Sequence, residues 1–230
     1  MPRMGLQARR NEQRREQREA LRERILDVSR EIVKREGFAS LSMRKLADAI
    51  DYSAAALYLH FKSRREIAHA LRMEGHARLH AAFLAHASIV DPAARLNAMA
   101  RAHVEFGLAE PETYRLMFME PADVADTAAN DIDRADQAAD PGAATLSLIV
   151  DAFVELRAAG RLPSRVAPAA CAEGLWTNLN GIVALKLNSA SLPETPVQTL
   201  VELSLDAWLA QASRIEPRNH SANRPDTSIR

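Results

Sequence analysis

The sequence predicts an all-α protein of about nine helices. Apolar residues recur at three- and four-residue steps along most of the chain, which is the period of an amphipathic helix. Alanine is abundant, aromatic residues make up only 5% of the chain, and no stretch alternates as a half-buried strand does. At 230 residues, with 47% hydrophobic content, the chain can form one large or two small helical domains.

The first segment, residues 1–19, is polar and rich in Arg, Glu and Gln, with no apolar stripe. It reads either as a solvated, frayed tail or as a flexible basic arm whose arginines order along a DNA minor groove. The first packed helix is predicted from about Ala20 to Glu36, with Gly37 as its C-cap. Four apolar residues at helical spacing mark its buried face: Leu21, Ile25, Val28 and Ile32.

Residues Ser42–Phe61 are the most informative segment. Four apolar residues define one buried helix face: Met43, Leu46, Ala47 and Ile50. Asp51-Tyr52-Ser53 then interrupts the pattern, because Asp tolerates the left-handed conformation of a tight turn and Ser53 suits a helix N-cap. A short second helix follows, anchored by Leu57 and Phe61. Two helices joined by so short a turn form a helix-turn-helix, whose second helix can enter a DNA major groove.

The remaining helices are predicted from their start and stop signals. Ser63 can cap a long helix to about Ala87, which we expect to link the two halves of the molecule mechanically. Asp91-Pro92 opens a helix to about Leu108, and Glu110-Pro111 opens another. The acidic residues Pro121–Pro141 are predicted to be a mobile loop.

Three further helices follow the acidic loop. The first is marked by Leu146, Ile149, Val150, Phe153 and Leu156 and ends at Gly160. Pro168 suits the first turn of the next, and the last helix begins near Val197. From Glu216 onward the composition predicts disorder.

The net charge of zero hides an asymmetry. Residues 1–70 hold 16 Lys and Arg against 10 Asp and Glu, a net charge of +6, and residues 71–230 carry the compensating −6. A basic N-terminal third that contains a helix-turn-helix indicates phosphate binding.

The helix-turn-helix segment resembles the DNA-binding region of the TetR/AcrR transcriptional repressors over about residues 21–67. Nine positions match that family's pattern: Ser42, Arg44, Ala47, Ser53, Leu57, Tyr58, His60, Phe61 and Ser63. Leu46 replaces Ile and Arg64 replaces Lys, while Ile50-Asp51-Tyr52 and Ala55 depart from the pattern at the turn and the groove-facing surface. The resemblance implies a homodimer that binds a palindromic operator in double-stranded DNA. It also implies that a small-molecule effector releases the protein from this operator.

The second half carries a weaker resemblance to one C-terminal subclass of these regulators. It rests on Pro111–Phe118, Gly160 and Leu175–Gly181. That subclass has a Trp followed several residues later by His-Gly, and Asn180 stands here where His is usual. We therefore expect four parts: a basic flexible arm (1–19), a helix-turn-helix domain (20–66), a ligand-binding and dimerisation domain (67–215) and a disordered tail (216–230).

The chemistry of the helix-turn-helix suggests its DNA contacts. Arg44 has the planar fork that binds guanine or phosphate bidentately, while the Tyr58 hydroxyl and the Lys62 ammonium suit phosphate oxygens. The groove-facing alanines can only touch thymine methyl groups, so specificity should depend on Arg44, Tyr52 and DNA shape. The predicted DNA-binding residues are Ser42, Arg44, Lys45, Tyr52, Ser53, Ala54, Ala55, Tyr58 and Lys62.

An effector pocket is predicted in the second domain, because the scarce aromatics gather there with Met and a few polar groups. Its candidate lining residues are His103, Phe106, Tyr114, Met117, Phe118, Phe153, Trp176 and Asn180. An ordinary hydrophobic core is the alternative interpretation. We expect a neutral or weakly polar effector, although Arg101 and Arg115 are close enough in sequence to change that.

The last two helices, about Pro168–Ser189 and Val197–Ala212, carry wide apolar stripes, which predicts a homodimer through a four-helix bundle. A DNA-binding protein without a small-molecule effector, whose second domain serves assembly or a protein partner, is the alternative function.

Other classes of protein receive little support. No nucleophile elbow, phosphate loop or dinucleotide fingerprint is present, so neither an enzyme nor a cofactor is predicted. His76 and His80 lie at zinc-ligand spacing, but a third ligand is missing, so no metal site is predicted. The single cysteine, Cys171, is expected to be a buried residue in a cytoplasmic protein. No apolar run approaches a membrane span, and no signal peptide is evident.

Overall fold

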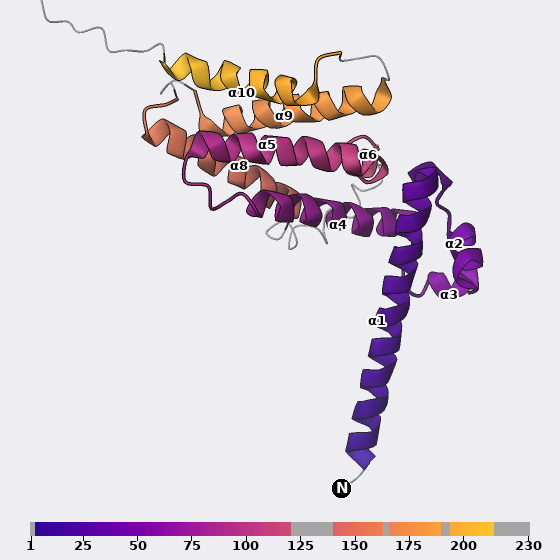
Figure 1. Ribbon diagram of the computed structural model, residues 1–230. Coiled ribbons are helices and arrows are strands. Elements are labelled where there is room, and N and C mark those ends of the chain that lie inside the picture. The colour runs from indigo at the N-terminus through magenta and orange to yellow at the C-terminus, as the bar shows by residue number, and fades with distance from the viewer. Residues whose placement is uncertain (1–2, 121–139, 163–165, 190–193, 214–230) are drawn as a thin grey trace, which may run out of the picture.

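The computed structural model describes residues 3–120, 140–162, 166–189 and 194–213 (Figure 1). Within these ranges the regular structure consists of nine α-helices and one short 3-10 turn, which agrees with the predicted all-α fold. The helices are α1 (Arg3–Glu36), α2 (Met43–Ile50), α3 (Ala54–Leu57), α4 (Arg64–Leu84), α5 (Pro92–Ala109), α6 (Pro111–Phe118), α8 (Pro141–Ala158), α9 (Pro168–Asn188) and α10 (Val197–Ser213); the 3-10 turn is η1 (Phe38–Ser40).

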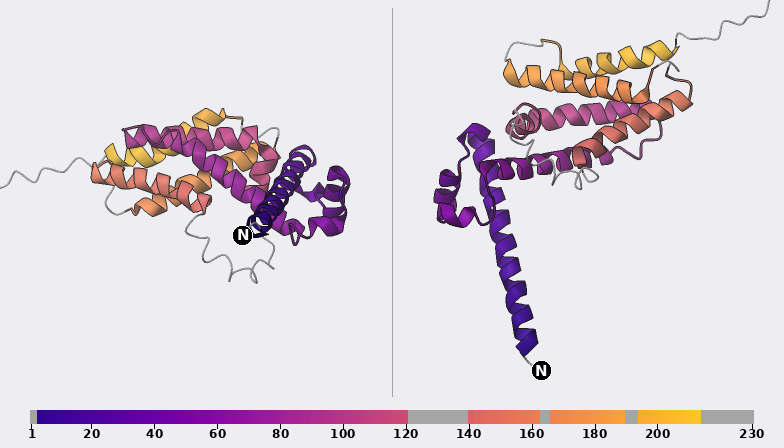
Figure 2. Two further views of the ribbon diagram at one scale, coloured as in Figure 1. Left: turned by 90° about the horizontal axis from the view of Figure 1, so that it is seen from below. Right: turned by 180° about the vertical axis from the view of Figure 1, so that it is seen from behind.

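The molecule has an elongated shape. Helices α4, α5, α8, α9 and α10 are stacked on one another, and α1 crosses one end of this stack and projects well beyond it (Figures 1 and 2). Helices α2 and α3 lie against the side of α1, while the N-terminus lies at the far end of the projection. The predicted helix-turn-helix therefore lies at one end of the molecule.

The molecule contains two hydrophobic cores. The first core joins α1, α2, α3 and the start of α4 around residues that are fully buried, such as Ile25, Leu57 and Phe61. The second joins α4, α5, α6, α8, α9 and α10. Helix α4 contributes to both, since Leu71 packs into the first core and Phe83 into the second. Helix α4 thus connects the two parts, as the sequence suggested, and α6 also reaches the first core through Leu116.

Local signals in the sequence explain most helix ends. Gly37 adopts φ +78°, and its N–H donates to the Val33 carbonyl, which closes α1. Asp91 and Asp140 accept from backbone N–H groups at the starts of α5 and α8, where prolines occupy the first turn. Helix α8 begins at Pro141, before Leu146, the first large apolar residue of its pattern. The Asp140 cap and Pro141 start the helix at this earlier point.

The N-terminal segment differs from the flexible arm that we expected over residues 1–19. Residues 3–19 form the first half of α1, in one helix of 34 residues. Arg, Glu, Gln and Ala are all strong helix formers, and a helix already nucleated by packing extends without a new nucleation cost. The lack of an apolar stripe indicated exposure here, and it did not indicate a lack of structure.

Some expectations fall on other parts of the chain. The acidic segment over 121–139 and the tail over 216–230 lie outside the described residues. Among the helices that are described, none is both long and apolar enough to cross a membrane.

Candidate nucleic-acid interface and effector site

The turn between α2 and α3 has the predicted geometry. Asp51 adopts the left-handed conformation, with φ 58° and ψ 48°. Ser42 and Ser53 cap the two helices, because each hydroxyl accepts from a backbone N–H three residues later, at 3.2 Å. Leu57 and Phe61 are fully buried, so packing on one side and the cap on the other fix the direction of α3.

Polar side chains suited to DNA surround this short helix. Arg44 and Lys62 are exposed, and Tyr52 and Tyr58 are exposed to 44% and 53% although both are large aromatics. An exposed tyrosine offers its ring and its hydroxyl to a partner, which is the role predicted for both.

The other predicted DNA-contacting residues differ in exposure and in their partners within the protein. Lys45 forms an ion pair with Glu36 at the end of α1, and its hydrogen bond lowers the pKa of that carboxyl. Ala55 is exposed, but Ala54 is half-buried against the first core. Ala54 therefore helps to seat α3, which leaves Ala55 as the more accessible of the two alanines.

Two arginines of α1 hold the end of α3 in a way that motif analysis missed. Arg18 donates to the Leu59 carbonyl at 3.1 Å, and Arg22 donates to the His60 carbonyl at 3.0 Å. The Arg22 guanidinium also lies 4.1 Å from the centre of the Phe61 ring. The four-residue spacing of these arginines was a visible signal, because it places them on one side of α1.

A groove of about 410 Å³ lies between this part of α1 and the end of α3. It is lined by Arg15, Arg18, Glu19, Arg22, Leu59 and His60. Burial and then the charges of Arg18 and Arg22 lower the pKa of His60, so the groove's positive charge comes from its arginines.

In the second domain, five of the eight predicted pocket residues form one cluster. The members are His103, Tyr114, Phe118, Trp176 and Asn180, which come from three helices, α5, α6 and α9. The Tyr114 hydroxyl donates to Asn180 Oδ1 at 2.6 Å and lies 2.9 Å from His103 Nε2. The His103 and Trp176 ring centroids are 4.9 Å apart.

The hydrogen bonds determine the tautomer of His103. The Asn180 amide N–H donates to the Trp176 carbonyl at 2.8 Å, so its oxygen is free to accept the single Tyr114 proton. His103 Nε2 must then carry a proton and donate to the Tyr114 oxygen. Burial lowers the pKa of His103 to about 3 and raises that of Tyr114, so both groups are neutral near pH 7.

This cluster borders an open cleft of about 290 Å³. Its lining consists of Tyr114, Phe118, Met119, Trp176, Thr177, Asn180 and Ala184. Three of these residues were not predicted, since Met119, Thr177 and Ala184 stand out by neither type nor charge. Phe83 of α4 was also missed, although its ring contacts those of both His103 and Trp176.

The other three predicted residues lie outside both the cluster and the cleft lining, and His103 belongs to the cluster without lining the cleft. Phe153 is fully buried in the second core, where Met117 also packs. Phe106 is half-buried, with the Arg78 guanidinium 5.7 Å from its ring centre. For these residues the alternative interpretation, an ordinary core, fits better.

The arginines that could have favoured an anionic effector are engaged elsewhere. Arg101 pairs with Glu202 at 2.7 Å. Arg115 pairs with Glu112 and donates to the Leu187 carbonyl at 2.8 Å. The two histidines at zinc-ligand spacing also diverge, since His76 packs edge-on against Phe118 and His80 contacts Thr145.

Most apolar residues of helices α9 and α10 that the structure describes are buried in the second core or pack against it. Leu179, Ile182 and Val183 are buried there, so the stripe that suggested a dimer is narrower than the sequence indicated. Two large apolar side chains remain exposed on these helices among the residues described, Leu185 at 54% and Leu203 at 59%.

Two family models match the chain. Residues 25–71 match the model described as bacterial regulatory proteins, tetR family, and residues 96–208 match that of the tetracyclin repressor-like C-terminal domain. No curated protein matches the sequence.

Solved structures share the fold over most of their length. A protein of unknown function from Rhodococcus sp. RHA1 is 26% identical, with 83% of this chain and 94% of that chain covered and a TM-score of 0.66. The TetR family transcriptional regulator PfmR from Thermus thermophilus is 20% identical, with 81% and 97% covered and a TM-score of 0.60. AibR in complex with isovaleryl coenzyme A and operator DNA is 16% identical, with 82% and 97% covered and a TM-score of 0.54.

Proposed function

This protein belongs to the TetR family of DNA-binding transcriptional regulators, and from that premise we propose that it is a repressor. It binds a palindromic operator as a homodimer and leaves it when a small, mostly apolar effector occupies the cleft of the second domain.

The observation that carries the DNA-binding part is the presentation of α3. Its buried anchors and its serine cap fix its direction, and Arg44, Tyr52, Tyr58 and Lys62 are exposed around it. Arg44 and Tyr52 would read the operator together with DNA shape, while Tyr58 and Lys62 would bind phosphates.

The effector part is supported by the cluster at the cleft. AibR, a neighbour in fold, has been solved in complex with isovaleryl coenzyme A and operator DNA, so a protein with this fold binds both a small molecule and DNA. In this chain the cleft combines aromatic side chains with the amide of Asn180, and Arg101 and Arg115 are already paired. A neutral or weakly polar organic molecule therefore fits it best.

Helix α4 offers the route from effector to DNA. Phe83 contacts the rings of His103 and Trp176, whereas Ile67 and Leu71 of the same helix lie in the first core. An effector that moves this cluster moves α4, and with it α3. It can release DNA only if it binds the DNA-free conformation more tightly.

The homodimer would use α9 and α10, with Leu185 and Leu203 at the contact. A two-fold axis between the bundles would place the two α3 helices about 34–36 Å apart, one turn of DNA. Sedimentation should give a dimer at micromolar concentration, and a monomer would contradict this part of the proposal.

DNA binding is tested with fragments of the protein's own promoter region at low salt. Lys62→Ala should flatten the plot of log affinity against log salt by about one unit per protomer, and Arg44→Ala should also weaken base preference. Arg157→Ala, an exposed residue of α8, is the matched control and should change neither. A wild-type protein that shifts no such fragment would refute the proposal.

Effector control is tested with the ligand that releases this fragment in a compound screen. Trp176→Ala removes one wall of the cleft and Ala184→Phe fills it, so both should abolish release while DNA affinity stays within a few-fold. If no compound releases the DNA, the alternative of a regulator without an effector stands. If both variants still respond, the effector binds elsewhere.

A further inference from the structure

The exposed first half of α1 has no role in the function proposed so far. We call residues 7–20 the N-terminal extension. Every residue in it is exposed, and none has a large apolar side chain. It projects past α3 as the continuation of a packed helix (Figure 2). A rigid, almost wholly polar helix beside a recognition helix requires an explanation.

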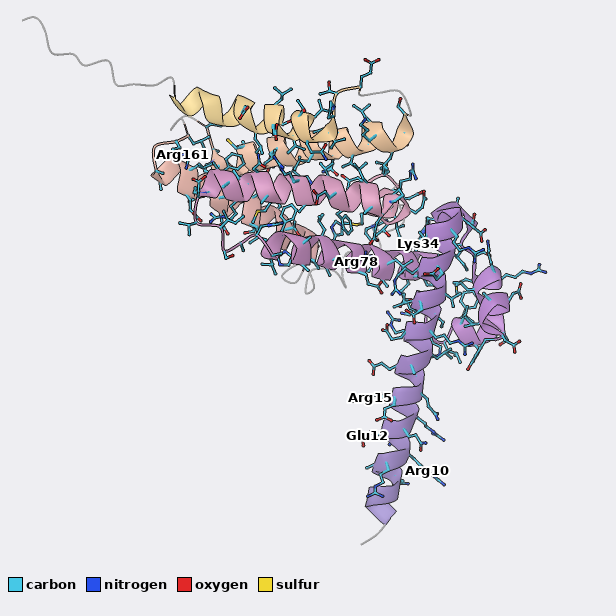
Figure 3. The ribbon with its side chains drawn as sticks, in the orientation of Figure 1. Arg10, Glu12, Arg15, Lys34, Arg78 and Arg161 are labelled. Atoms are coloured by element: carbon cyan, nitrogen blue, oxygen red, sulfur yellow. The ribbon has the colours of Figure 1, made fainter. Side chains whose placement is uncertain are left out.

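Charge in the extension is partly separated by face, with Arg9 and Arg15 nearer the glutamates and the other three arginines together. Arg10, Arg14 and Arg18 recur every four residues, so they lie within about 80° of one another around the helix axis. The glutamates Glu12, Glu16 and Glu19 lie on the opposite face, within about 60° of one another. Figure 3 shows Arg10 and Glu12 on opposite sides of α1. The helix therefore presents one face, the arginine face, on which every charged side chain is an arginine.

The arginine face meets the end of α3 through Arg18. Arg18 contacts the Leu59 carbonyl just beyond α3, and Arg22, the next residue in the same four-residue series, contacts the His60 carbonyl. Arg10 projects to the side of α1 on which α2 and α3 lie (Figure 3). The groove between α1 and the end of α3 is lined by Arg18 of this face together with Arg15, Arg22 and Glu19.

We propose that the N-terminal extension binds the DNA backbone beside the half-site read by α3, with Arg10 and Arg14 contacting phosphates. This inference rests on the proposed function. Arg18 and Arg22 hold the extension against the helix-turn-helix, so the extension and α3 approach the duplex as one body.

The dimensions fit this role. From residue 10 to residue 18 the helix rises about 12 Å, which is the axial length of roughly three to four phosphates of one strand. Guanidinium groups bind phosphate oxygens bidentately, and a preordered helix loses little conformational entropy on binding. The absence of large apolar residues in the extension argues against a membrane surface or a partner helix, both of which need an apolar face.

The test compares two duplexes made from the promoter fragment that the wild-type protein shifts. One is trimmed to the footprinted half-sites, and the other carries about ten further base pairs at each end. The wild-type protein should bind the longer duplex more tightly. Arg10→Gln/Arg14→Gln should bind both alike, with a salt slope on the longer duplex flatter by about 1.8 units per protomer. The affinity of this double variant for the longer duplex is lower than that of the wild-type protein, and this difference should shrink at least about ten-fold between roughly 50 and 200 mM salt.

The control separates the arginine face from net charge. Arg9→Gln removes the same charge as Arg10→Gln one residue away, but on the side of the helix nearer the glutamates. Gln is a strong helix former, so circular dichroism should show unchanged helix content in each variant. Arg10→Gln should weaken binding to the longer duplex, and Arg9→Gln should not.

The outcomes are distinct. A wild-type protein that binds neither duplex overturns the proposed function. A wild-type protein that binds with no dependence on flank length, or an effect of Arg9→Gln equal to that of Arg10→Gln, overturns the role of the extension while DNA binding by α3 stands.

Discussion

Replacing Tyr114 with Phe tests the polar centre of the second domain. Tyr114 is fully buried, and its hydroxyl joins His103 to Asn180. Tyr114→Phe removes this one oxygen and preserves the ring packing. The His103 N–H then loses its acceptor in a site where the imidazole is also fully buried.

The structure gives the size of the effect. A buried donor left without a partner costs about 1–3 kcal/mol. Asn180 is half-buried at the open cleft and can bond water instead, so it adds less. We expect the free energy of unfolding to fall by about 2 kcal/mol, which lowers Tm by roughly 4–8 °C for a chain of this size.

Urea unfolding followed by tryptophan fluorescence measures this loss, because Trp176 lies against His103 in the same cluster. Tyr58→Phe makes the same chemical change at an exposed site and should alter stability by less than about 0.5 kcal/mol. In a His103→Leu background Tyr114→Phe should cost less, since no buried N–H is stranded. Equal stability of Tyr114→Phe and Tyr58→Phe would refute the hydrogen-bonded arrangement.

Three further predictions concern other features of the structure. Gly107→Ala would place its Cβ 2.6 Å from Val183 Cγ1, so urea unfolding should show that the free energy of unfolding falls by about 1–3 kcal/mol. Gly181→Ala places its Cβ in open space and should cause no such loss. Because burial lowers the pKa of His103 to about 3 from its ordinary 6.5, protons favour the unfolded state as pH falls from 6.5 toward 3. Wild-type stability should drop by about 2 kcal/mol from pH 7 to pH 5 through this residue, and His103→Gln should show a smaller drop over the same range. Asp51→Val forces a β-branched residue into the left-handed turn, so the free energy of unfolding should fall by about 1–2 kcal/mol and a gel shift should show weaker operator binding. Asp51→Gly should retain both the stability and the operator binding. Equal behaviour of the two variants would contradict this account.

The sequence by itself determined the elements whose physics is local. The caps at Ser42, Ser53 and Ser63, the left-handed turn at Asp51 and the end of α1 at Gly37 each depend on neighbours within four residues. The fold class and the helix-turn-helix followed from these signals and from apolar periodicity. The extension of α1 was also a local property, and it was missed because exposure was taken for disorder.

The tertiary structure alone decided which helix faces meet. Tyr114 and Asn180 are 66 residues apart, and no spacing rule places the hydroxyl of one 2.6 Å from the oxygen of the other. Periodicity put Phe153 and Trp176 equally on apolar faces, yet packing buried the first in the core and left the second at the cleft. A residue's face is set by its own helix, whereas its neighbours depend on how all the helices fill the interior together.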